Sequence, residues 1–296
     1  MRSGYQAATP EQTVSDARGE STPCPVCGST MTVSFQDDEA VYKLCSNCSY
    51  LKPCLLDLDA YAVNVKIYSE RYDEQLKTAA VVTDKARRKF GRFLDRIAPY
   101  HQLGRMIDIG CGAGRMLACA ADRGWHAVGA DPSMQNLSED CPDGVEIHPR
   151  LLHECEFPDG HFDVVHANEV MEHVDDIIPL LTEMRRVLRP GGLIVLRTPN
   201  HRSWTARAVG ARWRHYGVAE IGHVGFFTPQ TFRKLFEAQR IDLLAIQTHH
   251  FSLRDRWSDE TPVIGGLCRV VYKLIGLLAT ATGQGERLMV WGRKPT

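Results

Sequence analysis

The chain of 296 residues lacks any run of 18 or more uncharged apolar residues, so no membrane-spanning helix is expected. It also has little net charge, because 35 basic and 36 acidic side chains leave −1, so no overall charge draws it to nucleic acid or to an anionic membrane. Its first 20 residues lack the apolar stretch of a secretory signal. We therefore expect a cytoplasmic protein whose ten cysteines remain reduced.

The remaining composition, 44% hydrophobic and 24% charged, is that of an ordinary globular protein. Residues 1–20 are polar without an apolar period, which predicts a disordered lead. Residues 21–56 hold five cysteines and two strand-like runs, MTVSF and AVYKL. Residues 57–103 show a helical pattern that Pro99 ends, which predicts a helical linker or cap. Residues 104–296 form the main domain in this interpretation.

Strand-like and helical segments alternate in the main domain, which is typical of an α/β fold with a mostly parallel sheet flanked by helices. Helices are expected at Arg115–Arg123 and Ile177–Leu188, the second closed by Pro190-Gly191-Gly192. The candidate strands are Met106–Ile109, His126–Gly129, Val145–His148, Val164–Ala167, Leu193–Thr198, Ile241–His249 and Leu288–Gly292.

A helical period over residues 262–283 predicts an amphipathic helix inserted between the last two strands. Its apolar stripe consists of Val263, Leu267, Val270, Val271, Leu274 and Leu278. We favour a helix that packs on the sheet or caps the site. The alternative is an interfacial helix, which would give peripheral membrane contact with a lipid-linked substrate.

Two Cys-x-x-Cys pairs, Cys24 with Cys27 and Cys45 with Cys48, are separated by 17 residues. Each pair offers two thiolates on one tight loop, and two pairs complete a tetrahedron around Zn²⁺. A redox role would need only one pair on a thioredoxin-like unit, so we favour zinc. Four sulfur ligands leave no open position, which makes this a structural zinc ribbon.

A glycine-rich turn joins the first strand of the main domain to a helix, in the order Asp108, Gly110, Gly112 and Gly114. Its spacing lacks the third glycine of the dinucleotide fingerprint, and Asp108 would repel a pyrophosphate but hold an ammonium group. Asp131 ends the second strand, where a carboxylate can accept hydrogen bonds from both ribose hydroxyls of a nucleoside. A solvated surface carboxylate is the alternative for Asp131.

The segments DIGCGAGR, GADPS, FPDGHFDVV, EVMEHV and LRPGGLIVL together resemble the consecutive motifs of class I S-adenosylmethionine-dependent methyltransferases, over about residues 104–250. The resemblance implies a seven-stranded sheet of order 3-2-1-4-5-7-6 and S-adenosylmethionine as cofactor. Many relatives carry an Asp after the third strand, whereas this chain has Glu154 nearby. The residues expected to bind the cofactor are Asp108, Gly110, Cys111, Gly112, Gly114, Asp131, Pro132, Glu154 and Asn168.

Glu169, Glu172 and His173 follow the fourth strand at a spacing that would share one face of a helix, and His223 is a further ligand candidate. Two carboxylates and imidazoles are typical of a metal site or a general base. The set resembles that of metal-dependent 2′-O-methyltransferases of small RNAs and of ubiquinone-pathway O-methyltransferases, which implies Mg²⁺, Mn²⁺ or Zn²⁺ there. The alternative has no metal: the acids cap a helix and a histidine serves as base.

Eight arginines and no acid lie in residues 185–214, and those after Asn200 are expected near the crevice. Arginine forks there could bind a phosphate or carboxylate of the acceptor. We favour O-methylation of a small molecule, glycan or natural product, phosphate-linked or lipid-linked. The alternatives are a sugar C-methyltransferase, an RNA 2′-O-methyltransferase, which the near-neutral charge disfavours, and a non-catalytic scaffold.

Overall fold

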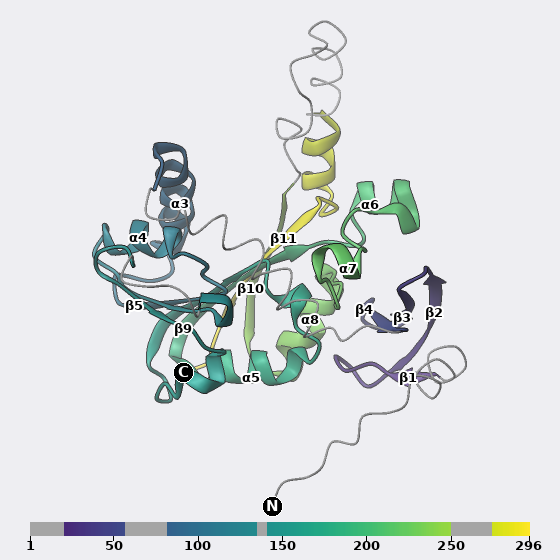
Figure 1. Ribbon diagram of the computed structural model, residues 1–296, viewed down its shortest axis with the longest axis horizontal. Helices are drawn as coiled ribbons and strands as arrows, with labels where there is room; N and C mark the ends of the chain where they lie inside the picture. Colours follow the sequence, from purple (N-terminus) through teal and green to yellow (C-terminus); the bar gives the residue numbers. More distant parts are fainter. Residues whose placement is uncertain (1–20, 57–81, 135–140, 250–273) are drawn as a thin grey trace, which may run out of the picture.

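The computed structural model describes residues 21–56, 82–134, 141–249 and 274–296, and two sheets organise them (Figure 1). The expected lead at 1–20 and the start of the expected helical linker, 57–81, lie outside the described residues. The boundaries between domains therefore stay predictions. No helix in the described ranges is long and apolar enough to cross a membrane.

The larger sheet has seven strands in the order β10-β11-β9-β8-β5-β6-β7. Strand β11 is antiparallel to both its neighbours, and β5 to β9 run parallel. This is the predicted order 3-2-1-4-5-7-6. The bounds are β5 Arg105–Ile109, β6 His126–Ala130, β7 Val145–His148, β8 Phe162–Asn168, β9 Leu188–Pro199, β10 Asp242–His249 and β11 Arg287–Arg293.

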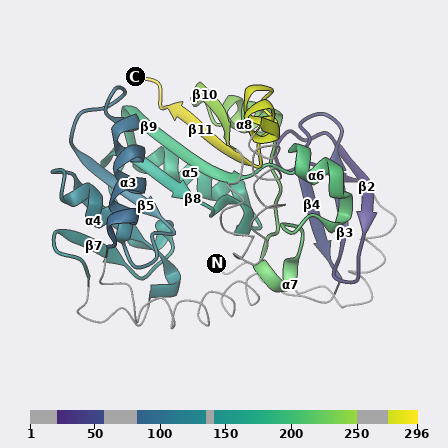
Figure 2. The ribbon, with the colours of Figure 1, turned by 90° about the horizontal axis from the view of Figure 1, so that it is seen from above.

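Helices cover both faces of this sheet, as the alternating pattern predicted (Figure 2). On one face α3 (Asp84–Ile97) and α4 (Arg115–Ala121) pack on alternate residues of the central strands. On the other, α5 (Ile177–Val187) and α8 (Pro229–Ala238) bury the remaining residues. The central strands β5 and β8 are mostly apolar because both of their faces are buried, whereas the edge strands β7 and β10 are partly exposed.

Strand β9 begins earlier than predicted, at Leu188 rather than Leu193. The buried Leu188 pairs with Phe162 of β8, and regular pairing resumes at Leu193 with Val164. Pro190-Gly191-Gly192 therefore lies in an irregularity of the strand rather than in a turn before it, with Gly191 at φ 74°. The helix before it ends at Val187, one residue short of the prediction.

Helix α3 confirms the expected end of the helical pattern, because its last residue is Ile97 and Pro99 follows. Thr83 begins it by accepting a hydrogen bond from the Ala86 amide. Short helices occupy several connections of the larger sheet. They are η1 Pro132–Met134, η2 Leu152–Cys155, η3 Met171–His173, α6 Trp204–Val209, η4 Gly210–Arg212 and α7 Val218–Ile221.

The smaller sheet is antiparallel, with strands β1 (Thr22–Pro23), β2 (Thr30–Gln36), β3 (Ala40–Cys45) and β4 (Leu51–Leu55) in that order. We call residues 21–56 the ribbon. Strands β2 and β3 contain the two runs predicted as strands. One side of the ribbon joins the core beneath α5 and α8, and its other side packs against the α6 region. Figure 2 shows β3 and β4 beside α6.

The predicted amphipathic helix is described only from residue 274, and residues 250–273 lie outside the described ranges. Residues 274–281 are helical and lie between β10 and β11, as expected. The expected packing is wrong for two members of the stripe, because Leu274 and Leu278 are each 56% exposed. Gly276 and Ala279 are the buried residues of this helical stretch instead.

Candidate active site

The glycine-rich turn lies at the carboxyl end of β5, directly before α4. Gly110 and Gly112 have φ angles of 68° and 52°, a region that other residues rarely adopt. A Cβ atom on Gly110 would lie 2.5 Å from Cγ2 of Val170. The backbone of the turn is therefore packed against the segment after β8, and only glycine fits there.

Asp131 follows β6, the neighbour of β5, and is 5% exposed. Its Oδ2 accepts a hydrogen bond of 2.8 Å from the Gly112 amide, and its Oδ1 accepts one of 3.0 Å from the Ser133 amide. The carboxylate thus joins the end of β6 to the glycine-rich turn. The predicted ribose acid and the predicted cofactor turn form one unit at the carboxyl edge of the sheet.

Asp108 has a partner that the sequence did not reveal. Its Oδ1 lies 2.6 Å from Nδ1 of His166 on β8, and both side chains are buried. The ring of Phe93 on α3 lies over His166, with centroids 4.6 Å apart. Asp108 and His166 are 58 positions apart, and only the pairing of β5 with β8 brings them together.

The other residues predicted to bind the cofactor lie near this edge and have local partners. Glu154 Oε2 accepts a hydrogen bond of 2.9 Å from the Leu151 amide and caps the η2 turn. Asn168 Oδ1 accepts one of 3.3 Å from Nη1 of Arg197, and Pro132 begins η1. Their contacts with a cofactor stay predictions.

Three of the four predicted acid and imidazole side chains meet beyond the end of β8. The ligand atoms of Glu172, His173 and His223 all lie within 4.8 Å of one another. The rings of His173 and His223 are 4.6 Å apart and nearly perpendicular, at 68°. We call these three residues the triad.

Backbone carbonyls orient both imidazoles of the triad. Nδ1 of His173 lies 3.0 Å from the Gly222 carbonyl oxygen, and Nδ1 of His223 lies 2.9 Å from that of His215. A carbonyl oxygen only accepts, so each Nδ1 donates, and the lone pair of each ring is on Nε2. Metal-binding histidines in proteins are oriented in this way.

Glu172 is the buried acid of the triad, with 1% of its surface exposed. Its Oε2 accepts a hydrogen bond of 2.8 Å from Oγ1 of Thr198, at the end of β9. Its Oε1 is buried and has no hydrogen-bond partner among the described residues. Burial raises the pKa of this carboxyl to about 7. A cation beside Oε1 would satisfy the oxygen and favour the ionised form.

Glu169 does not join the triad. Its φ angle of 58° turns the chain directly after β8, and the next helical turn is the short η3. The helical face expected for Glu169, Glu172 and His173 is therefore not formed. The Glu169 carboxylate forms an ion pair with Arg287 on β11 and lies 4.0 Å from Nε of Arg197.

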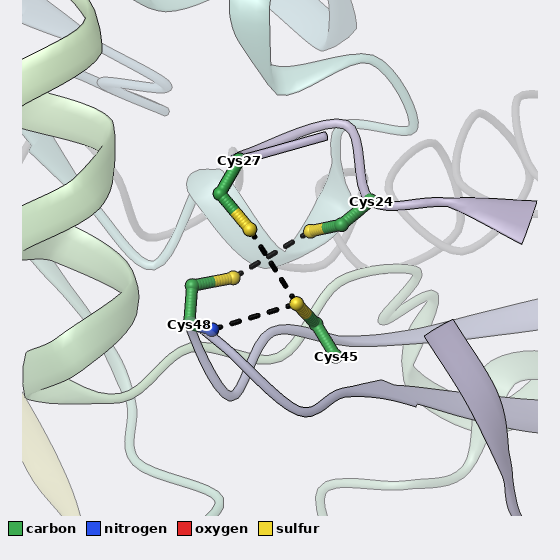
Figure 3. Close-up of side chains that lie close together, drawn as sticks. All are labelled: Cys24, Cys27, Cys45 and Cys48. Carbon is green, nitrogen blue, oxygen red and sulfur yellow. Dashed lines mark hydrogen bonds between the residues drawn. The ribbon is translucent and has the colours of Figure 1, made fainter. Parts of the chain in front are cut away.

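The four cysteines of the ribbon point their sulfur atoms toward one another (Figure 3). The Cys24 and Cys48 sulfurs are 3.5 Å apart, as are those of Cys27 and Cys45. Zn–S bonds of about 2.3 Å in a tetrahedron place sulfurs roughly 3.8 Å apart, so the cluster fits a zinc ion. The Cys48 amide donates to the Cys45 sulfur at 3.4 Å, which orients this ligand.

The paired thiols also differ in acidity. The hydrogen bond from Cys48 lowers the pKa of Cys24 to about 5, and the same contact raises the pKa of Cys48. The contact therefore favours the thiolate form of Cys24 over that of Cys48. Zn²⁺ requires thiolate ligands, so this thiolate suits an incoming ion.

The arginines of residues 185–214 lie in different parts of the structure. Arg186 and Arg189 form ion pairs with Asp159 and Asp163, away from the carboxyl edge. Arg202 and Arg207 instead line a cavity of about 240 Å³ between the ribbon and α6. The cavity is lined by Ser34, Phe35, Leu44, Leu51, His201, Arg202, Ala206, Arg207, Gly210, Ala211 and Tyr216, and no acid is among them.

Comparison with known proteins identifies the family of this domain. The family model described as a methyltransferase domain matches residues 82–243. The ubiquinone biosynthesis O-methyltransferase of Bradyrhizobium sp. (strain ORS 278) is 35% identical over 190 residues, which are 60% of this chain and 74% of the relative. That of Rhizobium rhizogenes is 31% identical over 193 residues, covering 60% and 76%.

Among solved structures, a SAM-dependent methyltransferase from Thermotoga maritima matches with a TM-score of 0.53 and 19% identity, over 77% of this chain and 99% of that one. This likeness supports the fold. The family match spans the glycine-rich turn, Asp131 and all three residues of the triad. The chain belongs to the methyltransferase domain family and is an S-adenosylmethionine-dependent methyltransferase.

Proposed function

We propose that this enzyme methylates a hydroxyl oxygen of a small molecule, and that its triad holds a divalent cation beside that hydroxyl. One observation carries the proposal: both imidazoles are fixed with the lone pair on Nε2, and Oε1 of the buried Glu172 has no hydrogen-bond partner among the described residues. The names of the relatives, ubiquinone biosynthesis O-methyltransferases, support oxygen as the acceptor atom.

The donor set fits such a cation. Two imidazole nitrogens and one carboxylate oxygen leave open positions on an ion, which substrate oxygens can occupy. When bound, Mg²⁺, Mn²⁺ or Zn²⁺ would lower the pKa of the acceptor hydroxyl and orient it. The residues themselves position the ligand atoms, and Thr198 holds the second oxygen of Glu172.

The cofactor site would lie at the ends of β5 and β6. Asp131 would accept hydrogen bonds from the ribose, and Asp108, tied to His166, would face the ammonium group of S-adenosylmethionine. In the transfer a C–O bond forms as the C–S bond of the sulfonium breaks, and the hydroxyl proton is released. The protein accelerates this step by holding the two reacting atoms in line.

For the acceptor we propose a molecule with an apolar ring or chain and an anionic group. The cavity between the ribbon and α6 supports this class, because Phe35, Leu44 and Tyr216 line it together with Arg202 and Arg207. Arginine recognises carboxylate and phosphate groups by paired hydrogen bonds. For the ribbon we propose a structural Zn²⁺ on its four cysteines. The cytoplasmic location stays a prediction.

Metal removal and replacement test the proposal, with 3,4-dihydroxybenzoate as the probe acceptor. Chelation should abolish methyl transfer. One equivalent of Zn²⁺, which the four thiolates take first, should not restore it, whereas Mg²⁺ or Mn²⁺ added afterwards should. Glu172→Gln should reduce the restored rate by at least about 10-fold, because the ion loses its charged ligand. Glu286→Gln, another buried acid, serves as the control. Methyl transfer that survives chelation would contradict the metal and leave a histidine as base.

A further inference from the structure

The segment that carries His223 lies between two parts of the molecule. Its Val224 and Gly225 amides donate to the Glu172 carbonyl oxygen, at 2.6 and 3.2 Å. Its Phe226 exchanges two backbone hydrogen bonds with Leu51, the first residue of β4, at 2.9 and 3.1 Å. We call residues 222–228 the histidine segment. One side of it contacts the triad, and the other pairs with the ribbon.

The ribbon presents to this segment the loop that contains two of its metal-binding cysteines, Cys45 and Cys48. The loop is residues 45–51, and neighbouring elements fix it. Oγ1 of Thr231 on α8 donates to the Cys48 carbonyl oxygen at 2.9 Å, and Nε2 of His201 lies 2.8 Å from the Ser49 carbonyl oxygen. The side chain of Tyr50 is fully buried, and its ring lies 5.3 Å from that of Phe227.

The contact between loop and segment leaves no spare room at Gly225. A Cβ atom there would lie 2.6 Å from the Tyr50 hydroxyl oxygen and 3.4 Å or more from the Tyr50 ring carbons. The Tyr50 hydroxyl has no hydrogen-bond partner among the described residues, so Tyr50 acts here by packing. The position of the ribbon loop therefore restricts the position of Gly225, two residues after His223.

We propose that the ribbon is a positioning element of the active site: its four-cysteine metal centre fixes residues 45–51, and these hold His223 in the triad. The inference rests on the proposed function for the role of His223. It assigns the ribbon an effect on methyl transfer rather than on folding alone. Loss of the ribbon metal should not change the proposed cofactor site. Ala130 and Asp131 hold the glycine-rich turn on β5 and β6, and β8 and β9 lie between these strands and the other side of the sheet.

A pair of substitutions at the contact tests this by rescue. Gly225→Ala should push the histidine segment from its place and lower the rate of methyl transfer to 3,4-dihydroxybenzoate by about 10- to 100-fold, as small displacements of catalytic groups do. Adding Tyr50→Phe removes the atom in conflict and should restore the rate to within about threefold, a coupling that independent sites do not show. Tyr50→Phe alone is the control. The Kd of S-adenosylmethionine should stay the same in all three.

Loss of rate in Gly225→Ala that Tyr50→Phe does not relieve would overturn the inference. So would a parallel loss of cofactor affinity, because the substitution would then act on the whole domain. Rescue requires a measurable rate, and hydrogen exchange of the amides of residues 222–228 provides the same comparison if the probe acceptor is not methylated. Exchange should accelerate in Gly225→Ala and return toward the wild-type rate in the double variant.

A second experiment tests the inference by removing the ribbon metal. Cys27→Ser changes the most exposed of the four cysteines, and hydrogen exchange is then followed in residues 222–228 and 108–114 of the full chain. We expect faster exchange in the histidine segment and unchanged exchange in the glycine-rich turn. Unchanged exchange in the histidine segment would overturn the inference, even if the ribbon itself unfolds. Failure of the proposed metal chemistry would leave this exchange pattern intact, so the two failures are distinguishable.

Discussion

At the scale of single residues, hydrogen bonds orient the side chains of the site. Two backbone carbonyls fix the tautomers of His173 and His223, and one hydroxyl, that of Thr198, holds Glu172. Glu169 follows β8 in the same segment as Glu172, but its carboxylate pairs with Arg287. Residue type alone does not separate these two acids, whereas their partners do.

Thr198→Val tests the support of the triad. The substitution keeps the shape but leaves a buried carboxylate without its donor, so unfolding free energy should fall by about 1–3 kcal/mol. Mn²⁺ affinity, measured by electron paramagnetic resonance of the free ion, should fall by about 10-fold. Thr205→Val is the matched control, since Oγ1 of Thr205 also donates to a glutamate, Glu286, at 2.8 Å. Equal Mn²⁺ affinities in the two variants would argue against the role of Thr198.

His201 gives a prediction on pH. Burial lowers its pKa from 6.5 to about 4, while it donates to the Ser49 carbonyl oxygen. The unfolded chain therefore takes up a proton first as pH falls, and stability present above pH 6.5 is lost toward pH 4. The loss should be about 3 kcal/mol. His201→Gln keeps a donor and cannot be protonated, so its urea unfolding should depend less on pH than that of wild type or of the exposed control His126→Gln. Identical pH profiles would contradict this.

At the scale of elements, the turns and strand ends form the site, and the glycine-rich turn is the clearest case. Gly110→Ala should weaken binding of S-adenosylmethionine by at least about 100-fold, because the new Cβ meets Val170 and the φ of 68° is strained. Gly283→Ala has the same kind of φ, 70°, with no atom near its Cβ. Calorimetry should show normal cofactor binding by Gly283→Ala. Weak binding by both variants would assign the loss of affinity to backbone strain alone.

The sequence predicts the strands and the glycine-rich turn well, because apolar runs and glycine spacing are local patterns. The strand order followed from the resemblance to class I methyltransferases. The sequence also predicts the cysteine cluster, whose ligands lie in two short motifs. It fails where partners come from distant strands: nothing near His166 indicates Asp108, and nothing near Glu169 indicates Arg287. The bulge before Leu193 is missed for the same reason, since Leu188 pairs with Phe162 of another strand.

At the scale of the whole molecule, the ribbon and the larger sheet share one core. Tyr50 and Cys48 belong to the same cluster of buried side chains as Phe227 and Phe232. The proposed cofactor site is on β5 and β6, which β8 and β9 separate from β11 and β10 in the sheet. The proposed function therefore places cofactor binding and acceptor activation on different strands, at one edge of the sheet.

Calorimetric titration with S-adenosylmethionine tests this division most directly, with wild type, Asp131→Ala and Glu172→Gln compared under one set of conditions. We predict one cofactor bound per chain in wild type and wild-type affinity in Glu172→Gln. Asp131→Ala should not bind, because its carboxylate holds the turn and, in our proposal, the ribose. Absence of binding by wild type at millimolar cofactor, or unchanged affinity in Asp131→Ala, would contradict the account.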